Sequence, residues 1–399
     1  MIACYTLKVQ VERFEHSPVG HLVPIHGYDG QLGRDYEHFA FVPDALPSTV
    51  GMRQHTLRLL SEADRAIGAL QAMTRLLPRP SLLVQPALTQ EAVATSALEG
   101  TYAPLMDVLE ADYVDVSKQS AQVREVRNYV RAAQRGLTLI EHLPICMRLA
   151  SELQQVLVRG TRGDEYDAGR VRQRQVCIGD RGQGIVGSRF VPPPNGPILE
   201  QGLSDWEKWV NADSDMPLLV RVALSHYQFE TLHPFSDGNG RIGRLLITLQ
   251  LIVARVLQFP ILNLSPWFEP RRDAYIDHLL QTSETGDFDP WIAFFAEAVK
   301  VRAEVACSTI DTLLTMRQHF IDTLRRDKAR GLALYLAGDL IGYPVLSVSD
   351  ITSQYEVSYP AANSAVERLV RLGLLHETTG GNYARVFRCD AVIRAIQAS

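Results

Sequence analysis

The twelve residues HPFSDGNGRIGR, positions 233 to 244, constrain the fold more than any other stretch of the chain. They join two segments with helical periodicity, PLLVRVALSHYQFETL before the motif and RIGRLLITLQLIVARVLQF from Arg241 onward. Gly238 and Gly240 allow positive φ values and close approach, so successive N–H groups around Asn239 can converge on one anion. The motif therefore predicts a tight connection between two helices that binds a negatively charged group.

The other side chains of the motif indicate which anion this is. His233 can exchange a proton near neutral pH, and Asp237 is a hard oxygen ligand of the kind that Mg²⁺ takes beside phosphate. Arg241 and Arg244 share one flank of the first helical turn, where the helix dipole also favours phosphate. The stretch is not a Walker A loop, and it is not a dinucleotide fingerprint because a helix precedes it. These residues favour a nucleotide polyphosphate with a metal and a base over a purely structural helix entry.

Composition and charge narrow the class of protein. The chain has 399 residues, 46% hydrophobic and 21% charged, which is ordinary for a globular protein of two or three domains. A net charge of −5 argues against a broad grip on nucleic acid. The N-terminus has no basic start followed by an apolar run, no long apolar window lacks a charge, and the five cysteines form no CxxC pair. We expect a reduced, soluble, cytoplasmic protein without membrane contact, disulfide framework or zinc knuckle.

The order of patterns along the chain predicts an all-α fold with one short β-hairpin and a small α+β unit at the C-terminal end. The expected parts are an irregular or partly extended segment (1–45), an N-terminal helical region (46–125), the core (126–300), a connecting helix (301–332) and the small unit (333–399).

Two segments outside the motif carry weaker signals. In TSALEG, Thr95 and Glu99 are one helical turn apart, and Gly100 is placed to cap the helix. From the residues alone, this segment is best interpreted as the end of an amphipathic helix. GQGIVGSRFVPP, residues 182–193, predicts a hairpin with an exposed edge that could accept an extended peptide, and a plain surface turn explains it equally well.

The C-terminal stretch has the order helix, turn, helix and two extended runs around Gly380 and Gly381, which predicts a winged helix-turn-helix with Ser358 as an N-cap. Such units often bind DNA. From Gly331 onward, however, five basic and six acidic residues leave a net charge of −1. A protein-interaction module is therefore slightly favoured over DNA binding.

The motif resembles the signature of the Fic (filamentation induced by cAMP) family, His-Pro-Phe-x-Asp/Glu-Gly-Asn-Gly-Arg-x-x-Arg, without a mismatch. ILNLSPWFEPRRDAYIDHL and GDFDPWIAFF extend the likeness over roughly residues 45–399. The resemblance implies a Fic-type helical bundle with a hairpin called the flap. It also implies transfer of AMP from ATP to a hydroxyl side chain of a target protein.

The resemblance assigns a role to each position of the motif. His233 would be the general base, and Asp237 would hold Mg²⁺ between the α- and β-phosphates. Asn239 and the amides of Gly238 and Gly240 would bind the α- and β-phosphates. Arg241 would bind the β-phosphate and Arg244 the γ-phosphate. The intervening Ile242 and Gly243 belong to the same expected nucleotide site.

The resemblance also reinterprets the weaker signals. TSALEG is similar to an inhibitory helix in which Glu99, with Thr95 and Gly100, pairs with Arg244 and spoils the pose of ATP. The flap would align the target protein, with Val186, Gly187 and Ser188 as candidates to touch ATP or target. Tyr275 is a candidate adenine contact, and a core tyrosine on a helix is nearly as good an interpretation.

Several alternatives stay open from the sequence. The same site could transfer phosphate or another nucleotide, or remove AMP, because the motif does not determine which phosphorus is attacked. A nucleotide-sensing transcriptional regulator is an alternative of another class. A homo-oligomer and DNA remain open as partners.

Overall fold

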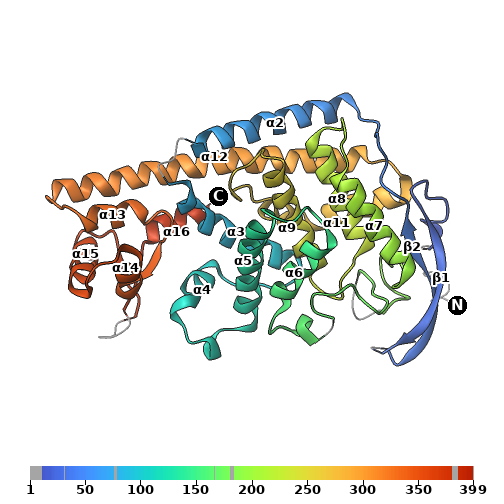
Figure 1. Cartoon of the computed structure of the whole chain (residues 1–399), viewed down its shortest axis with the longest axis horizontal. Coiled ribbons are helices and arrows are strands. Elements are labelled where there is room, and N and C mark those ends of the chain that lie inside the picture. Colours follow the sequence, from blue (N-terminus) through green and yellow to red (C-terminus); the bar gives the residue numbers. More distant parts are fainter. Residues whose placement is uncertain are drawn as a thin grey trace.

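The computed structural model describes residues 11–30, 32–75, 79–165, 167–179, 184–379 and 385–398. This part of the chain is mostly helical, with two small sheets (Figure 1). The helices are α2 (Gln54–Arg75), α3 (Val84–Leu98), α4 (Leu105–Glu110), α5 (Ala121–Leu139), α6 (Met147–Val158), α7 (Pro197–Asn211), α8 (Leu218–Leu232), α9 (Asn239–Val253), α10 (Ser265–Phe268), α11 (Arg272–Thr285), α12 (Asp289–Arg326), α13 (Leu332–Asp339), α14 (Val348–Tyr355), α15 (Tyr359–Arg371) and α16 (Asp390–Gln397). The strands are β1 (Gly20–Asp29), β2 (Arg34–Pro43), β3 (Val345–Ser347), β4 (His376–Glu377) and β5 (Val386–Arg388).

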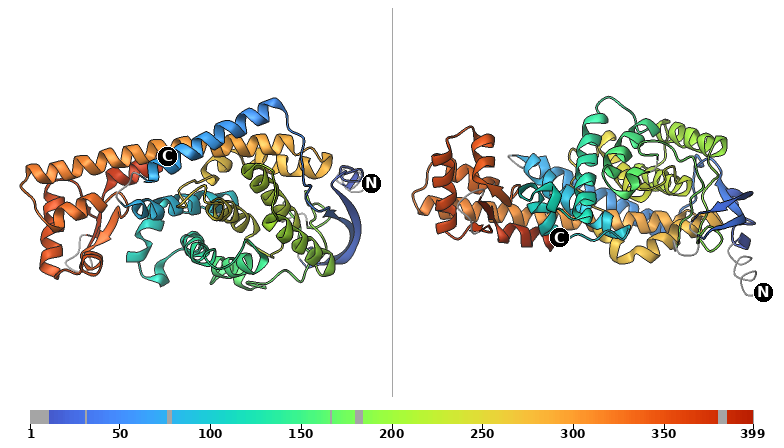
Figure 2. Two further views of the ribbon diagram at one scale, coloured as in Figure 1. Left: turned by 45° about the horizontal axis from the view of Figure 1, so that its top comes forward. Right: turned by 90° about the horizontal axis from the view of Figure 1, so that it is seen from below.

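The 38-residue helix α12 runs along most of the molecule and packs against α2 (Figures 1 and 2). Its apolar positions continue without a break from Trp291 to Leu324. The expected boundary between residues 300 and 301 therefore falls inside one helix, and no separate connecting helix exists among the described residues. None of the described helices combines the length and the apolar character that crossing a membrane requires.

The two helices that flank the motif lie at the centre of the fold. α9 is buried almost all round, as expected for an apolar helix without a solvent face. It packs against α3, α5, α6 and α8, while α8 packs in turn against α7 and α12. Because both flanking helices are held on several sides, the turn between them has a rigid support.

The N-terminal segment was expected to be irregular or partly extended, and its described residues form a regular two-stranded ribbon. β1 and β2 pair antiparallel over ten residues each, with Gly20 opposite Pro43. Along β2, the alternation buries Tyr36, His38 and Ala40 on one face. Residues 1–10 lie outside the described part of the chain.

The predicted hairpin is present only in reduced form. Its two sides meet at one isolated antiparallel bridge, between Ile178 and Phe190. The Phe41 N–H of β2 donates to the Val191 carbonyl at 2.9 Å, so this side of the hairpin is covered and not exposed as expected. Residues 180–183, which include the first two positions of GQGIVGSRFVPP, lie outside the described residues.

The C-terminal unit combines α13 to α16 with a three-stranded sheet of order β3-β5-β4. Ser347 and Asp350 form a capping box at the start of α14. Ser358 occupies the N-cap position of α15, but its side chain makes no capping hydrogen bond. Gly380 and Gly381 of the expected wing lie outside the described residues, and the winged helix-turn-helix remains a prediction.

The same unit packs against the segment that contains α3 and α4. Arg388 lies 3.3 Å from Glu110, and the Tyr113 hydroxyl donates to Asp350 at 2.7 Å. The segment that carries Glu99 is thus held between the core and the C-terminal unit.

Candidate active site

His233 ends helix α8 in a left-handed backbone conformation, with φ of 50° and ψ of 62°. Its Nδ1 lies 3.2 Å from the Glu230 carbonyl oxygen, which can only accept a hydrogen bond. Nδ1 therefore carries the proton, and Nε2 keeps its lone pair. Burial, followed by the nearby Arg172 guanidinium, lowers the pKa of His233 to about 4. The imidazole is neutral at pH 7 and can accept a proton.

The glycine turn leaves backbone donors at the start of α9. Gly238 caps the helix with φ of 85°, and the first intrahelical bond runs from the Ile242 N–H to the Gly238 carbonyl at 3.0 Å. The helix geometry leaves the N–H groups of Asn239, Gly240 and Arg241 without a helical acceptor. Together with the helix dipole they form an anion site.

Three residues of the expected nucleotide site have structural roles in the described part of the chain, and their contacts with a nucleotide stay predictions. The Asn239 side chain accepts from the Phe235 N–H at 2.8 Å and donates to its carbonyl at 2.7 Å, so the amide side chain closes the turn. Ile242 is fully buried in the core, and its N–H is used in the helix. Gly243 lies against the side chain of Glu230. Asn239 still borders the cleft above the turn. A helix shows only one face to the site, and Ile242 and Gly243 lie on another face.

Arg241 and Asp237 lie together beside the turn. Arg241 is 4% exposed, with Nη1 3.3 Å from Glu125 and Nη2 3.6 Å from Asp237. Asp237 also accepts from the Gly238 N–H at 2.9 Å and keeps 23% of its side chain exposed. Glu125 had no signal in the sequence, because it comes from the distant helix α5.

Arg244 is bound by the end of α3. Its Nη2 lies 2.6 Å from Glu99, and its Nε donates to the Thr95 hydroxyl at 2.7 Å. Burial opposes ionisation of Glu99, but the attraction of Arg244 outweighs it and holds the pKa of that carboxyl below its usual range. Gly100 follows α3 with φ of 84°, as its capping position requires.

Glu99 lies directly over the start of α9. A Cβ atom placed on Gly240 would be 2.1 Å from the Glu99 carboxylate. The carboxylate therefore occupies the space in front of the helix N-terminus, where a phosphate would bind.

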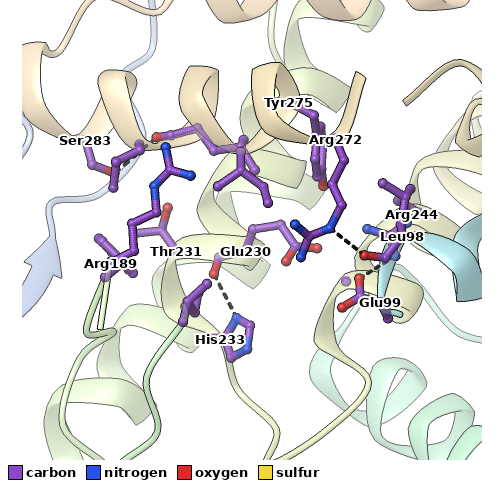
Figure 3. Close-up of a pocket in the computed structure, with 16 residues that line it drawn as sticks. Leu98, Glu99, Arg189, Glu230, Thr231, His233, Arg244, Arg272, Tyr275 and Ser283 are labelled. Atoms are coloured by element: carbon purple, nitrogen blue, oxygen red, sulfur yellow. Dashed lines mark hydrogen bonds and ion pairs between the residues drawn. The ribbon is translucent and has the colours of Figure 1, made fainter. Parts of the chain in front are cut away.

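Two adjoining cavities meet at these residues. A pocket of about 140 Å³ is lined by Glu99, His233 and Arg244 at one end and by Ile276 and Leu279 at the other. A wider cleft of about 1370 Å³ continues over the glycine turn and the flap. Figure 3 shows the Glu99–Arg244 pair and His233 around the pocket, with Glu230 between them in that view.

Tyr275 lines the pocket but is 5% exposed. Its hydroxyl lies 2.7 Å from His226 Nε2, and its ring packs near Phe268 and Trp291. This is the core tyrosine of the alternative interpretation, and an adenine contact at its edge stays a prediction.

The flap residues are arranged differently from the prediction. Ser188 is 2% exposed, and its hydroxyl donates to the Ile185 carbonyl at 2.7 Å. Val186 packs into a cluster with the ribbon residues Tyr36 and Ala40. Only Gly187 of the three lines the cleft. Packing of the ribbon on the flap turns Val186 and Ser188 away from the site.

Glu230 is a site residue that the sequence analysis missed, although it precedes His233 by only three residues. Its Oε1 is buried without a hydrogen-bond partner among the described residues, 4.0 Å from His226 Nε2. Burial raises the pKa of Glu230 to about 8, despite the opposing charge of Arg244. Its carboxyl group is therefore mostly protonated at pH 7.

We expect Gly243→Ala to lower the free energy of unfolding by about 1–3 kcal/mol. The added Cβ would lie 2.2 Å from Glu230 Oε1 and 3.2 Å from Phe229, inside a packed interior. Gly68→Ala in α2 is the matched control, because nothing lies within 4 Å of its Cβ. The control should gain about 0.5–1 kcal/mol from helix propensity. Urea denaturation midpoints measure both, and equal stability of Gly243→Ala and the parent would contradict the expectation.

Fold and site together define a class of protein: a helical protein in which a neutral histidine lies beside a helix N-terminus that can bind an anion. The Fic/DOC family N-terminal region matches residues 57–138, and the Fic/DOC family domain matches residues 144–251. The chain therefore contains a Fic/DOC family N-terminal region followed by a Fic/DOC family domain.

Named relatives and a solved structure agree with this placement. Protein adenylyltransferase fic-1 of Caenorhabditis briggsae is 33% identical over 136 residues, 34% of this chain and 24% of that protein. Protein adenylyltransferase Fic of Nematostella vectensis is 34% identical over 149 residues, 36% of this chain and 31% of that protein. The chain thus spans about a quarter to a third of the length of these relatives. A Fic family protein from Desulfovibrio desulfuricans shares the fold, with a TM-score of 0.57 and 22% identity over 86% of this chain and 98% of that one.

Proposed function

We propose that this protein transfers AMP from ATP to the hydroxyl group of a Ser, Thr or Tyr side chain on a target protein. The observation that carries the proposal is the neutral His233, whose Nδ1 lies on the Glu230 carbonyl and whose Nε2 is left as a base. It lines the same cleft as Asp237, Gly238 and Gly240. The names of the relatives, protein adenylyltransferases, support the same reaction.

The reaction needs few covalent steps from the protein. The target hydroxyl gives its proton to His233 Nε2 while its oxygen forms a bond to the α-phosphorus of ATP. The bond from that phosphorus to the bridging oxygen breaks, and pyrophosphate leaves with the bonding electrons. The amides at the start of α9 and the Arg241 guanidinium stabilise the charge on the phosphates. Positioning and charge neutralisation therefore do most of the catalytic work.

The residues fit a magnesium ion that arrives with the nucleotide. Among the described residues, no group of three or more His, Cys, Asp or Glu side chains could hold a metal by itself. Mg²⁺ does not need one, because one or two carboxylates usually suffice when phosphates and waters complete its shell. Asp237 lines the cleft with a partly exposed carboxylate and would be that ligand. Bound there, Mg²⁺ would supply charge neutralisation at the phosphates.

We further propose that Glu99 restrains this activity. Its carboxylate occupies both Arg244 and the space in front of Gly240, so a triphosphate meets a negative charge where its own charge should bind. The target would dock on the cleft side of the flap, near Gly187 and Ile178.

Labelled ATP tests the proposal. Glu99→Gly protein should transfer label from the α-phosphate to protein and none from the γ-phosphate. Label from the γ-position would indicate phosphate transfer instead. Salt-sensitive binding of duplex DNA without transfer of either label would favour a nucleotide-sensing regulator.

A further inference from the structure

Arg172 is a fully buried arginine without an acidic partner among the described residues. Its side chain is 0% exposed, and it lies in the segment that leads into the flap. Burial of an unpaired charge costs several kcal/mol, on the order of the penalty seen for broken buried ion pairs. Such a group is expected only where other dipoles stabilise it.

The stabilising dipoles are backbone carbonyl groups at the end of α8. Arg172 donates from Nε to the His233 carbonyl at 2.8 Å and from Nη2 to the Leu232 carbonyl at 3.5 Å. Its own N–H donates to the Pro234 carbonyl at 2.9 Å. The end of a helix presents carbonyl groups without helical donors and a partial negative charge, so a guanidinium is well placed there.

These bonds hold the peptide groups on both sides of His233. The left-handed conformation of a non-glycine residue costs about 1–3 kcal/mol and persists only when the surroundings maintain it. The direction of the His233 side chain depends on this backbone, because the two flanking peptide planes orient the Cα–Cβ bond. Arg172 therefore fixes the direction of the imidazole without touching its ring.

The same guanidinium also reaches both ends of the flap. It donates from Nη2 to the Pro193 carbonyl at 2.5 Å and from Nη1 to the Arg174 carbonyl at 3.1 Å. The planar guanidinium group of Arg172 thus joins the base of the flap to the turn that carries His233. A lysine could not replace it, since an ammonium group is a point donor and cannot span three separate segments.

We propose that Arg172 is the positioning residue of His233, holding its backbone, the direction of its imidazole and its neutral state, and tying these to the flap. The charged groups around His233 are Arg172 in the flap segment, Glu99 at the end of α3 and Asp237 in the turn. The two carboxylates favour the protonated imidazole, whereas Arg172 and burial oppose it. The expected effect of Arg172 on AMP transfer rests on the proposed function. The expected effects on the conformation and the titration of His233 do not depend on the proposed function.

The first test uses the full chain without nucleotide. The histidine side chains are labelled with ¹⁵N, and the His233 signal among the 11 histidines is identified by its loss in His233→Gln. The parent should show one neutral tautomer, protonated at Nδ1, from pH 5 to 8. Arg172→Gln should raise the pKa of His233 towards its ordinary value near 6.5 and mix the two tautomers. Arg170→Gln, an exposed arginine in the same segment, should leave both unchanged.

Arg172→Lys keeps the test decisive where Arg172→Gln does not fold. Lysine preserves the charge, so the pKa of His233 should stay low. Loss of the fork should lower kcat for AMP transfer by about 10- to 100-fold, with the KM for ATP unchanged, because a small displacement of a reacting group has effects of that order. An unaltered His233 titration and tautomer in folded Arg172→Gln, or full kcat in Arg172→Lys, would overturn the inference. The predicted titration change without AMP transfer in any variant would support it and overturn the proposed function.

Discussion

Replacement of Glu99 by glycine should raise AMP transfer by about 10- to 1000-fold at saturating ATP and Mg²⁺. Two unit charges about 4 Å apart near a protein surface attract by roughly 4 kcal/mol, and screening reduces this for a partly exposed group. The Glu99 side chain is 39% exposed and lies 2.6 Å from Arg244. We therefore expect a smaller increase in the transfer rate than the full 4 kcal/mol would give. The substitution also empties the space in front of Gly240.

The rate of label transfer from α-labelled ATP measures this effect. Glu99→Gln serves as a second variant, because it removes the charge but leaves a side chain of similar size over Gly240. It should be more active than the parent and less active than Glu99→Gly. Glu141→Gly, an exposed glutamate after α5, controls for non-specific effects of losing an acid. Equal rates for the parent and Glu99→Gly would remove the inhibitory role of this residue.

Loss of His233 should reduce transfer in the Glu99→Gly background by about 100- to 10,000-fold, the usual contribution of a general base. His233→Asn is the better substitution than His233→Ala. Asparagine tolerates the left-handed backbone at φ of 50°, whereas alanine would add about 1–2 kcal/mol of strain there. The variant thus removes the base and leaves the turn in place.

Binding must be measured beside the rate. Calorimetric affinity for ATP with Mg²⁺ should change by no more than a few-fold in His233→Asn, because the proposed phosphate ligands are the amides, Arg241 and Arg244. The pH dependence gives a second check. With a pKa of about 4, His233 stays neutral above that value, so its own protonation should leave transfer undiminished between pH 6 and 8. Undiminished transfer by His233→Asn would contradict the assigned role.

Most of the helices could be predicted from sequence because their apolar residues recur at helical spacing. α8 begins and ends within two residues of the expected segment. α9 begins two residues before Arg241 but stops at Val253, six residues short of the expected end at Phe259. The glycine turn could also be predicted from local sequence, because only glycine adopts φ of 85° without strain, as Gly238 does.

Predictions that depended on distant packing were less successful. The segment of the ribbon β1–β2 was expected only as irregular or partly extended. Its pairing and its contact with the flap could not be predicted, because the flap contact joins residues far apart in the chain. The directions of Val186 and Ser188 follow from that contact, and neither could be seen in GQGIVGSRFVPP alone. The expected boundary between residues 300 and 301 falls inside α12, because the apolar pattern of this helix continues across it.

The sequence by itself determined the glycine turn with its base, its acid and its two arginines. These residues are close in the chain at the start of one helix, so they must also be close in space. The sequence cannot show which residues from other helices complete the site. Glu99 was assigned only through the resemblance of TSALEG to an inhibitory helix, and Glu125 and Arg172 gave no signal. These residues meet the motif from the end of α3, from α5 and from the flap segment, at separations of 145, 116 and 61 residues. Such contacts form only when several helices bury their apolar faces against one another and so fix the relative positions of the helices. The pattern of residues along the chain does not predict that packing.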